Sequence, residues 1–201
     1  EHQKFISLRK EQTGQVQGFL LISNIITPDE QRCLLRGNIN VLNARLADAL
    51  FFYNNDKAKI NKFGMQVFCE ELKKVRFHEK LGSQYDRVNR ISEIAVEMAK
   101  LFGKDTKLIS KAATLIKADL VSEMVTEFPG LQGIMGSKYA LLDGYPVEIA
   151  DAVREHYSPL GPKDNVPKGN ISIILAISEK LEYLTAFWSI DIKPTGSKDP
   201  F

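Results

Sequence analysis

The chain has 201 residues, 44% of them hydrophobic, which is enough apolar material to bury a core in one or two domains. Its formal net charge of +2 does not by itself indicate a nucleic-acid or membrane partner, so any RNA-binding surface has to be a local patch. No run approaches the roughly 18 apolar residues of a membrane span, and residues 1–10 lack a signal-peptide pattern and a methionine. We therefore expect a soluble, cytoplasmic piece of a longer protein.

The first 24 residues predict a β-hairpin. Two β-prone runs, 3–10 and 15–24, flank the turn sequence EQTG. A helix is then expected to begin at Thr27, whose hydroxyl can cap it, because Pro28 and two acidic residues follow. The helical pattern continues, with Gly37 as a point where it could break, until the polar run that begins at Asn54.

Helical periodicity dominates the rest of the chain. Gly103 and Asp105 indicate where one helix ends and the next is capped. The stretch 158–170 contains three prolines and two glycines, which is typical of a surface excursion or a mobile lid. The predicted helices span 66–77, 84–102, 105–128, 131–142, 146–157 and 170–188.

This order of elements predicts a mainly α fold with two parts. Residues 1–60 should form a partial α+β region, a hairpin followed by a helix, and residues 61–201 a helical domain.

The segment GLQGIMGSK, residues 130–138, resembles a phosphate-binding loop only superficially. Such a loop needs a lysine directly after its second glycine and a preceding strand, whereas Ser137 follows Gly136 and the preceding residues are helical. The alternative is that Pro129 and Gly130 end one helix, and that Gly133 and Gly136 on the next allow close approach of another backbone.

Histidine and cysteine give no recognisable catalytic or metal-binding pattern. His2, His78 and His156 are far apart in the sequence, and His78 and His156 are better explained as surface or hydrogen-bonded structural residues. Cys33 and Cys69 form no CxxC motif, so we expect buried free thiols in a reducing compartment.

Two further features could carry chemistry. Glu179 and Glu182 share a helical face, which would suit a metal or a general acid, although a solvated face beside Lys180 is favoured. The segment IKPTGSKDPF contains Lys193 and Lys198 and could hold a phosphate or an RNA backbone, or simply be a connector.

Four segments, taken together and in order, resemble the β subunit of the bacterial two-subunit (α2β2) glycyl-tRNA synthetase. The last two are long and unusual, which makes the resemblance specific. The segments are RGNINVLNARLADALFFYNND (36–56), VRFHEKLGSQYDRVNRI (75–91), KADLVSEMVTEFPGLQGIMGSKYA (117–140) and KPTGSKDPF (193–201).

The resemblance implies a domain similar to the HD phosphohydrolase superfamily, whose active members chelate metal through a His, a His-Asp pair and a later Asp. Aligned with that pattern, Arg87 replaces the first histidine, Ile116-Lys117 lies at or near the pair, and Glu179 or Glu182 lies near the last Asp. Because isoleucine and lysine do not ligate a divalent cation, we expect no metal and no catalytic residue here, only a reused scaffold.

The resemblance also implies the partners. Glycine activation with ATP, and with Mg, belongs to the α subunit, while the β subunit serves tRNA recognition and assembly. The fragment itself is then non-catalytic and has no cofactor, its partners are the α subunit and glycine tRNA, and no membrane is involved. Two alternatives remain open: a stand-alone HD-type metal-dependent phosphohydrolase acting on a nucleotide, and a purely structural subunit-contact module.

Six basic residues are candidates for tRNA binding. If the helical bundle brought some of them together, they would form a basic patch that the small net charge conceals. The alternative is that they are ordinary solvated residues on helix surfaces. The candidates are Arg87, Arg90, Lys111, Lys117, Lys193 and Lys198.

Overall fold

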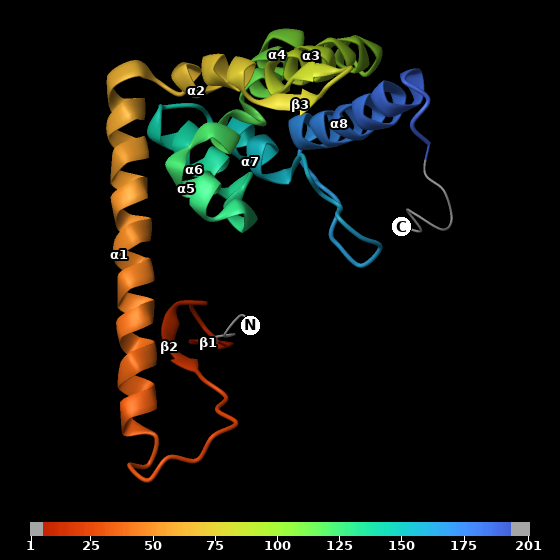
Figure 1. The fold of residues 1–201 in the computed structure, drawn as a ribbon. Coiled ribbons are helices and arrows are strands. Elements are labelled where there is room, and N and C mark those ends of the chain that lie inside the picture. Colours follow the sequence, from red (N-terminus) through yellow and green to blue (C-terminus); the bar gives the residue numbers. More distant parts are fainter. Residues whose placement is uncertain (1–5, 194–201) are drawn as a thin grey trace. The chain divides into compact units, whose positions relative to one another are not determined.

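The computed structural model describes residues 6–193, and its contacts divide the chain into two compact units, residues 1–47 and 48–201 (Figure 1). The dividing point lies inside a long helix. Contacts alone do not define functional domains, and the division after residue 60 stays a prediction.

The first unit begins with the expected hairpin. Strand β1 (Ile6–Arg9) pairs antiparallel with β2 (Val16–Leu20). Gly14 has a φ of 66° and donates its N–H to the carbonyl of Lys10, so the turn uses a conformation that glycine adopts at little cost. The hairpin prediction is confirmed for the described residues, while residues 1–5, including His2, lie outside them.

Helix α1 (Arg32–Phe63) begins later than the sequence indicated. The start predicted at Thr27 is wrong, because Glu30 and Gln31 have φ angles of 55° and 69°, which are not helical. The Thr27 hydroxyl instead accepts a hydrogen bond from the Gln31 N–H at 3.0 Å. Gly37 does not interrupt the helix.

The stop predicted near Asn54 is also wrong, since α1 continues to Phe63. Its polar residues anchor a different segment of the second unit. The buried Asp56 accepts hydrogen bonds from the backbone N–H groups of Glu123 and Met124 at 2.9 and 3.0 Å, and from the Tyr139 hydroxyl at 2.6 Å. A run that resembles a helix terminator is therefore a tertiary contact.

The second unit contains the C-terminal half of α1 and the remaining elements, and the mainly α prediction is confirmed. The longer helices are α3 (Gln84–Leu101), α4 (Thr106–Leu115), α6 (Ile134–Leu142), α7 (Val147–Glu155) and α8 (Asn170–Ser189). The shorter elements are α2 (Gln66–Glu71), the 3₁₀ helices η1 (Leu72–Lys74), η2 (Ala118–Val121) and η3 (Pro129–Leu131), α5 (Glu123–Glu127), β3 (Arg76–His78) and β4 (Gly82–Ser83).

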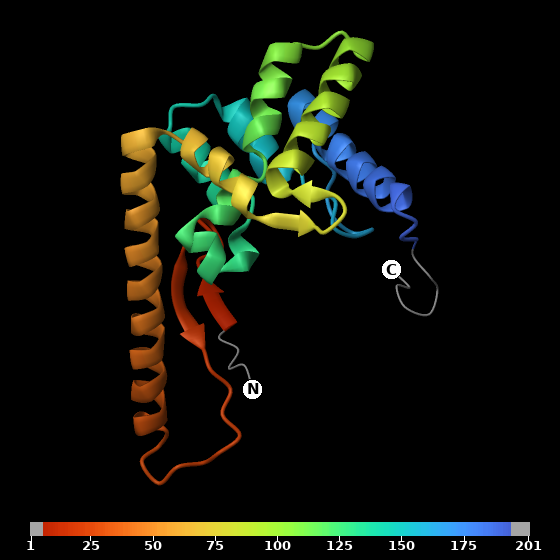
Figure 2. The same ribbon diagram turned by 45° about the horizontal axis from the view of Figure 1, so that its top comes forward.

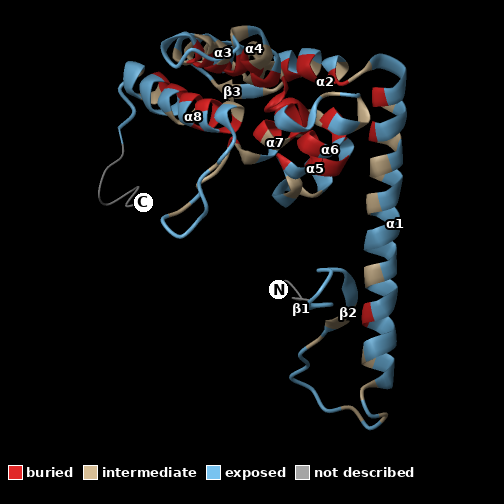
Figure 3. Ribbon diagram, turned by 180° about the vertical axis from the view of Figure 1, so that it is seen from behind, coloured by how far each residue is buried: buried red, intermediate tan, exposed pale blue. Residues whose placement is uncertain are grey.

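Helix α3 packs against both α4 and α8, and α7 packs against α6 and α8 (Figures 1 and 2). The buried residues of this unit, red on the ribbon of Figure 3, lie where these helices face one another. Phe68, Ile91, Ile116 and Leu175 are among the fully buried residues. The core therefore fixes the inner faces of α3, α4, α7 and α8, from which the candidate site is built.

The segments predicted as single helices over 66–77 and 105–128 are both interrupted. The first ends at Glu71 and continues as η1 and the small β3–β4 hairpin. The second divides into α4, η2 and α5, where the Ser122 side chain caps α5 by accepting from the Val125 N–H. At the second break the buried Asp119 of η2 bonds the backbone of Gly133 and Gly136, and local periodicity does not report such bonds.

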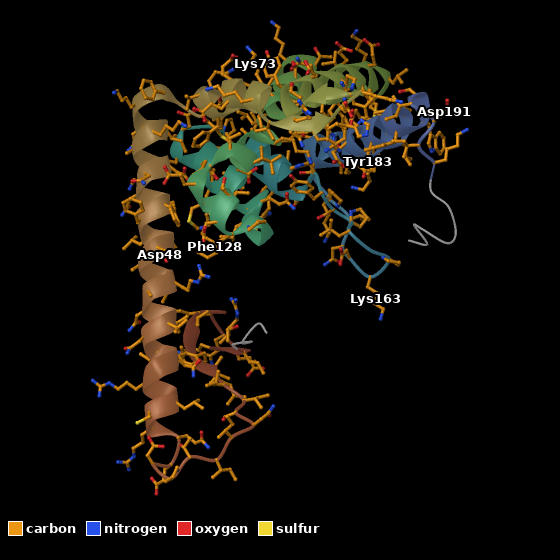
Figure 4. The ribbon with its side chains drawn as sticks, viewed as in Figure 1. Asp48, Lys73, Phe128, Lys163, Tyr183 and Asp191 are labelled. Carbon is orange, nitrogen blue, oxygen red and sulfur yellow. The ribbon has the colours of Figure 1, made fainter. Side chains whose placement is uncertain are left out.

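Other local predictions are confirmed. The Asp105 side chain caps α4 by accepting from the Lys107 and Leu108 N–H groups. The stretch after α7 is an irregular loop, with Lys163 at its tip (Figure 4). Within residues 6–193, none of the helices is long and apolar enough to cross a membrane.

Candidate functional site: a buried ion-pair cluster

Arg87 on α3 lies at the centre of a buried group of charges. Its Nη2 is 2.7 Å from Oε1 of Glu179, and its Nε is 2.9 Å from Oε2 of Glu182. The side chains of Arg87 and Glu182 are only 7% and 1% exposed. A guanidinium that bonds two carboxylates in a dry environment has fixed geometry and strong charge-assisted hydrogen bonds.

Two further cations complete the cluster. Arg90, one helical turn after Arg87, bonds Oε1 of Glu182 through Nε and Nη2 at 3.0 and 2.8 Å. Lys117, between α4 and η2, places its Nζ 3.1 Å from Oε1 of Glu179. We call Arg87, Arg90, Lys117, Glu179 and Glu182 the ion-pair cluster.

Local structure aims these side chains at one another. A capping box at Ser83 and Asp86 begins α3, so that Arg87 and Arg90 follow on one face. Glu179 and Glu182 have the same three-residue spacing on α8. The expectation that these glutamates form a solvated face is wrong, because the cations of α3 and Lys117 draw them inward.

Aromatic rings surround the cations. The Arg87 guanidinium carbon lies 4.5 Å from the centroid of the Phe77 ring and 5.3 Å from that of Tyr183. Lys117 Nζ lies 3.7 Å from the Tyr157 ring centroid. Burial lowers the pKa of Lys117 to about 8, an effect that the Glu179 charge opposes.

Asp119 explains the glycine-rich segment. Its buried Oδ2 accepts hydrogen bonds from the backbone N–H groups of Gly133 and Gly136 at 2.6 and 2.8 Å. A Cβ on Gly136 would lie 2.8 Å from Val153 and 3.0 Å from Asp119, and one on Gly133 would lie 3.2 Å from the Arg154 backbone oxygen. The predicted close approach of a backbone is confirmed at Gly133, although this residue precedes α6 and does not lie on it, whereas the close neighbours of Gly136 are side chains. Burial raises the pKa of Asp119 to about 6, although both glycine hydrogen bonds lower it.

His156 has a structural role. The imidazole is fully buried, and its Nδ1 lies 2.7 Å from the Val153 carbonyl oxygen, to which an Nδ1–H donates. Burial, with the nearby Lys117 charge, holds the pKa of His156 well below its usual value. Nε2 has no hydrogen-bond partner among residues 6–193. The interpretation of His156 as a hydrogen-bonded structural residue is confirmed, and in His78 the Nδ1 accepts from the Lys80 N–H.

The two cysteines differ. Cys69 is a buried free thiol, as expected, and burial raises its pKa to about 12. Cys33 is exposed, so the expectation of burial is wrong for that residue.

The cluster combines three cations with two carboxylates, which leaves both carboxylates neutralised by protein groups. Among the described residues there is no group of three or more His, Cys, Asp or Glu that could hold a metal. The cluster's ion pairs join α3 and the α4–η2 junction to α8. The positions that the resemblance aligned with the HD metal ligands, Arg87, Lys117, Glu179 and Glu182, meet at this point, while the HD-like architecture stays a prediction.

The five candidates for tRNA binding that lie within residues 6–193 do not form one surface. Arg87 and Lys117 are buried, and Arg90, 35% exposed, bonds Glu182. Lys111 is exposed, with its Nζ 4.9 Å from the Tyr145 ring centroid. Lys193, the last described residue, is also exposed. Lys198 lies outside the described residues. A tRNA contact for any of the six stays a prediction, and burial makes it least compatible with Arg87 and Lys117.

A basic surface that contains only one of the candidates, Arg90, lies on and beside the β3–β4 hairpin. Lys74 at the end of η1, Arg76 on β3 and Lys80 in the turn after β3 are exposed and, within residues 6–193, form no ion pair. Lys80 and Arg90 line the same hollow of about 320 Å³. We call Lys74, Arg76, Lys80 and Arg90 the basic hairpin. The charge run KKVRFHEK, residues 73–80, is the signal that could have indicated it.

The sequence of the chain matches one protein family over its whole length. A family model described as the glycyl-tRNA synthetase beta subunit matches residues 1–201. The whole chain is similar to the glycine–tRNA ligase beta subunits of Paracoccus denitrificans (53% identity), Dinoroseobacter shibae (51%) and Neisseria meningitidis serogroup C (44%). It spans 29%, 28% and 28% of the length of these relatives.

Proposed function

The chain belongs to the glycyl-tRNA synthetase beta subunit family, and on this premise we propose that it supports the attachment of glycine to tRNA. The match over all 201 residues supports this proposal. In the proposed α2β2 enzyme of the cytoplasm, the α subunit activates glycine with ATP and Mg, and the β subunit helps to bind glycine tRNA. The chain described here contributes part of that β subunit.

Within this assembly the second unit acts as a non-catalytic scaffold. The observation that carries this part is the ion-pair cluster, in which Arg87 and Lys117 neutralise the two glutamates. A divalent cation placed there would meet the three positive charges of the cluster and carboxylates that already have partners. The cluster thus has a structural use, fixing α3 and α8, and offers no activated water or nucleophile.

The basic hairpin is the surface we assign to tRNA. Its exposed cations can neutralise phosphates without reading base sequence, and such contacts position an RNA on a protein. Arg90 links this surface to the interior, because its Nη1 donates to the Leu81 carbonyl at 3.1 Å while Nε and Nη2 hold Glu182. The ion-pair cluster would then hold the hairpin rigidly against α3.

The experiment is reconstitution of the enzyme from the α subunit and a full-length β subunit that carries this chain. Glycine-dependent pyrophosphate exchange reports activation, and formation of glycyl-tRNA reports the complete reaction. We expect both activities in the assembly and neither with the 201-residue chain alone. Glycine-dependent exchange by the chain without any α subunit would contradict the proposal.

The two alternatives are outcomes of related measurements. Release of phosphate from nucleotides by the isolated chain with added Mn²⁺ would favour a phosphohydrolase. If the reconstituted enzyme charges tRNA normally after the basic hairpin is reversed in charge, the tRNA surface is wrong and a subunit-contact module gains support.

A further inference from the structure

Helix α8 carries a row of exposed apolar side chains on the face that does not enter the core. Their exposed fractions range from 37% to 53%, although all five are large. We call these residues the α8 stripe: Ile173, Ile177, Leu181, Leu184 and Trp188.

The spacing makes the stripe continuous. At about 100° per residue, the five positions fall within an arc of roughly 80°, and at 1.5 Å per residue they extend over roughly 22 Å. The inner face of the same helix carries Leu175, Ser178 and Glu182, all of which are buried. Helix α8 therefore has two faces built for burial, and within residues 48–193 only the inner one is covered.

A hollow adjoins the stripe at its N-terminal end. It encloses about 360 Å³ and is lined mainly by apolar side chains, Met98 and Phe102 from the end of α3 and Ile173, Ile174 and Ile177 from α8, with Lys104 and Asn170 as its polar lining residues. Phe102 is itself 61% exposed and the neighbouring Leu101 is 83% exposed. The hollow is large enough to receive a bulky apolar side chain, and the surface around it extends the stripe onto α3.

Exposed apolar surface of this extent usually marks an interface. RNA is a poor occupant, because none of the five stripe residues is charged and phosphate contacts need cations. The family relatives provide a better one: the chain spans 28–29% of their length, so more than two thirds of such a subunit lies outside the matched region. A segment of the same polypeptide also has a high effective concentration.

We propose that the α8 stripe is the docking site for an amphipathic helix from another part of the same β subunit. This helix lies along the stripe and inserts one bulky apolar side chain into the hollow between Phe102 and Ile177. The inference rests on family membership and on the exposed apolar surface, and it is independent of the tRNA contacts assigned to the basic hairpin.

The test uses a full-length β subunit that carries this chain, with a photo-reactive benzophenone side chain at Leu181. We expect irradiation to cross-link this position, within one molecule, to a peptide from outside residues 1–201. The matched control is the same group at Val147 on α7, which is 60% exposed and lies outside the stripe. The control should give no such product.

Four outcomes would overturn the proposal: cross-links that join two β subunits, cross-links to the α subunit in the assembled enzyme, cross-links confined to residues 1–201, and a control that reacts as strongly with the same peptide. Each of them assigns the stripe to a different occupant or removes its specificity.

A second measurement does not depend on cross-linking. The double variant Ile177→Ser, Leu184→Ser in the full-length subunit should lose hydrogen-exchange protection in α8 and in the cross-linked peptide. Leu141→Ser, Val147→Ser is the control, because these residues have comparable exposure away from the stripe. Unchanged protection in the stripe variant would refute the docking.

Discussion

Arg87 on α3 and Glu182 on α8 are joined by a 2.9 Å hydrogen bond between Nε and Oε2, although 94 residues separate them in the sequence. Glu182 also holds Arg90, so its carboxylate is shared by two guanidinium groups from one helix. Because Glu182 is almost fully buried, loss of its charge would leave the buried Arg87 with Glu179 as its only carboxylate and the partly exposed Arg90 with none.

Glu182→Gln should therefore destabilise the second unit by about 3 kcal/mol, the lower end of the range for breaking a buried ion pair. Glu97→Gln is the control, because Glu97 pairs with Lys100 on the surface and such pairs contribute about 0–1 kcal/mol. Urea unfolding followed by circular dichroism measures both. Equal stabilities of the two variants would contradict a structural role for the cluster.

The glycine-rich segment gives a second prediction. Gly136→Ala should lower the free energy of unfolding by about 1–3 kcal/mol, because the added methyl group would contact Val153 and Asp119 at 2.8 and 3.0 Å. Gly130→Ala should have little effect, since its Cβ would meet nothing within 4 Å. Thermal unfolding measures the stability of both variants. If Gly130→Ala is destabilised and Gly136→Ala is as stable as the wild type, close packing at Gly136 is refuted.

The buried His156 predicts a pH dependence. Its pKa is lower in the folded state than in the unfolded state, so below pH 6.5 the unfolded chain binds a proton that the folded chain does not. The stability that neutral His156 provides is present above pH 6.5 and is lost as the pH falls, by up to about 1.4 kcal/mol per pH unit. Asp119, with its raised pKa, acts in the opposite direction over part of this range.

The comparison that isolates His156 is between wild type and His156→Gln, because Asp119 is present in both. Between pH 6.5 and 5 the free energy of unfolding should fall more steeply in the wild type. If the free energy of unfolding falls with the same slope in both proteins, His156 takes up its proton in the folded state as readily as in the unfolded state.

Metal content gives a direct check of the scaffold. We expect the purified chain to carry no stoichiometric iron, manganese or zinc, because Arg87 and Lys117 neutralise Glu179 and Glu182. Elemental analysis is the measurement. A stoichiometric metal that disappears in Glu179→Gln would mean that the cluster rearranges into a metal site.

Local signals predicted much of the fold. The helix predicted over 84–102 is found at Gln84–Leu101, and that predicted over 170–188 at Asn170–Ser189. Asp105 caps α4 as expected, because a side chain that bonds the next two or three N–H groups acts within one turn. Periodicity and caps depend on near neighbours, which a sequence displays directly.

Distant contacts decided the failures. Asp56 was interpreted as part of a helix terminator, but it holds the start of α5 and the Tyr139 hydroxyl. Asp119 interrupts a predicted helix because it bonds Gly133 and Gly136. Glu182 was expected on a solvated face because Lys180 lies beside it in the sequence, whereas the cations that bury it lie more than 90 residues earlier.

The candidate site divides in the same way. Family resemblance aligned Arg87, Lys117 and the two glutamates with the metal-ligand positions of the HD pattern, and the structure brings these residues together. Of the basic hairpin, only Arg90 was a candidate. Lys74 and Arg76 were missed because the sequence interpretation extended a helix over 66–77. In the structure Lys74 instead ends η1 and Arg76 lies on β3. In a strand such as β3, successive side chains such as those of Arg76 and Phe77 point to opposite faces, which a helix does not impose.

The most direct measurement of the central claim is tRNA charging by the assembled enzyme after charge reversal of the basic hairpin. The variant is Lys74→Glu, Arg76→Glu, Lys80→Glu, and a triple reversal at Lys57, Lys138 and Lys163 is the control with the same change in net charge. We predict normal glycine-dependent pyrophosphate exchange in both. Glycyl-tRNA formation should weaken in the hairpin variant alone, and the salt dependence of its tRNA affinity should fall by close to one unit for each lost phosphate contact. Normal charging by the hairpin variant across a salt series would contradict the account.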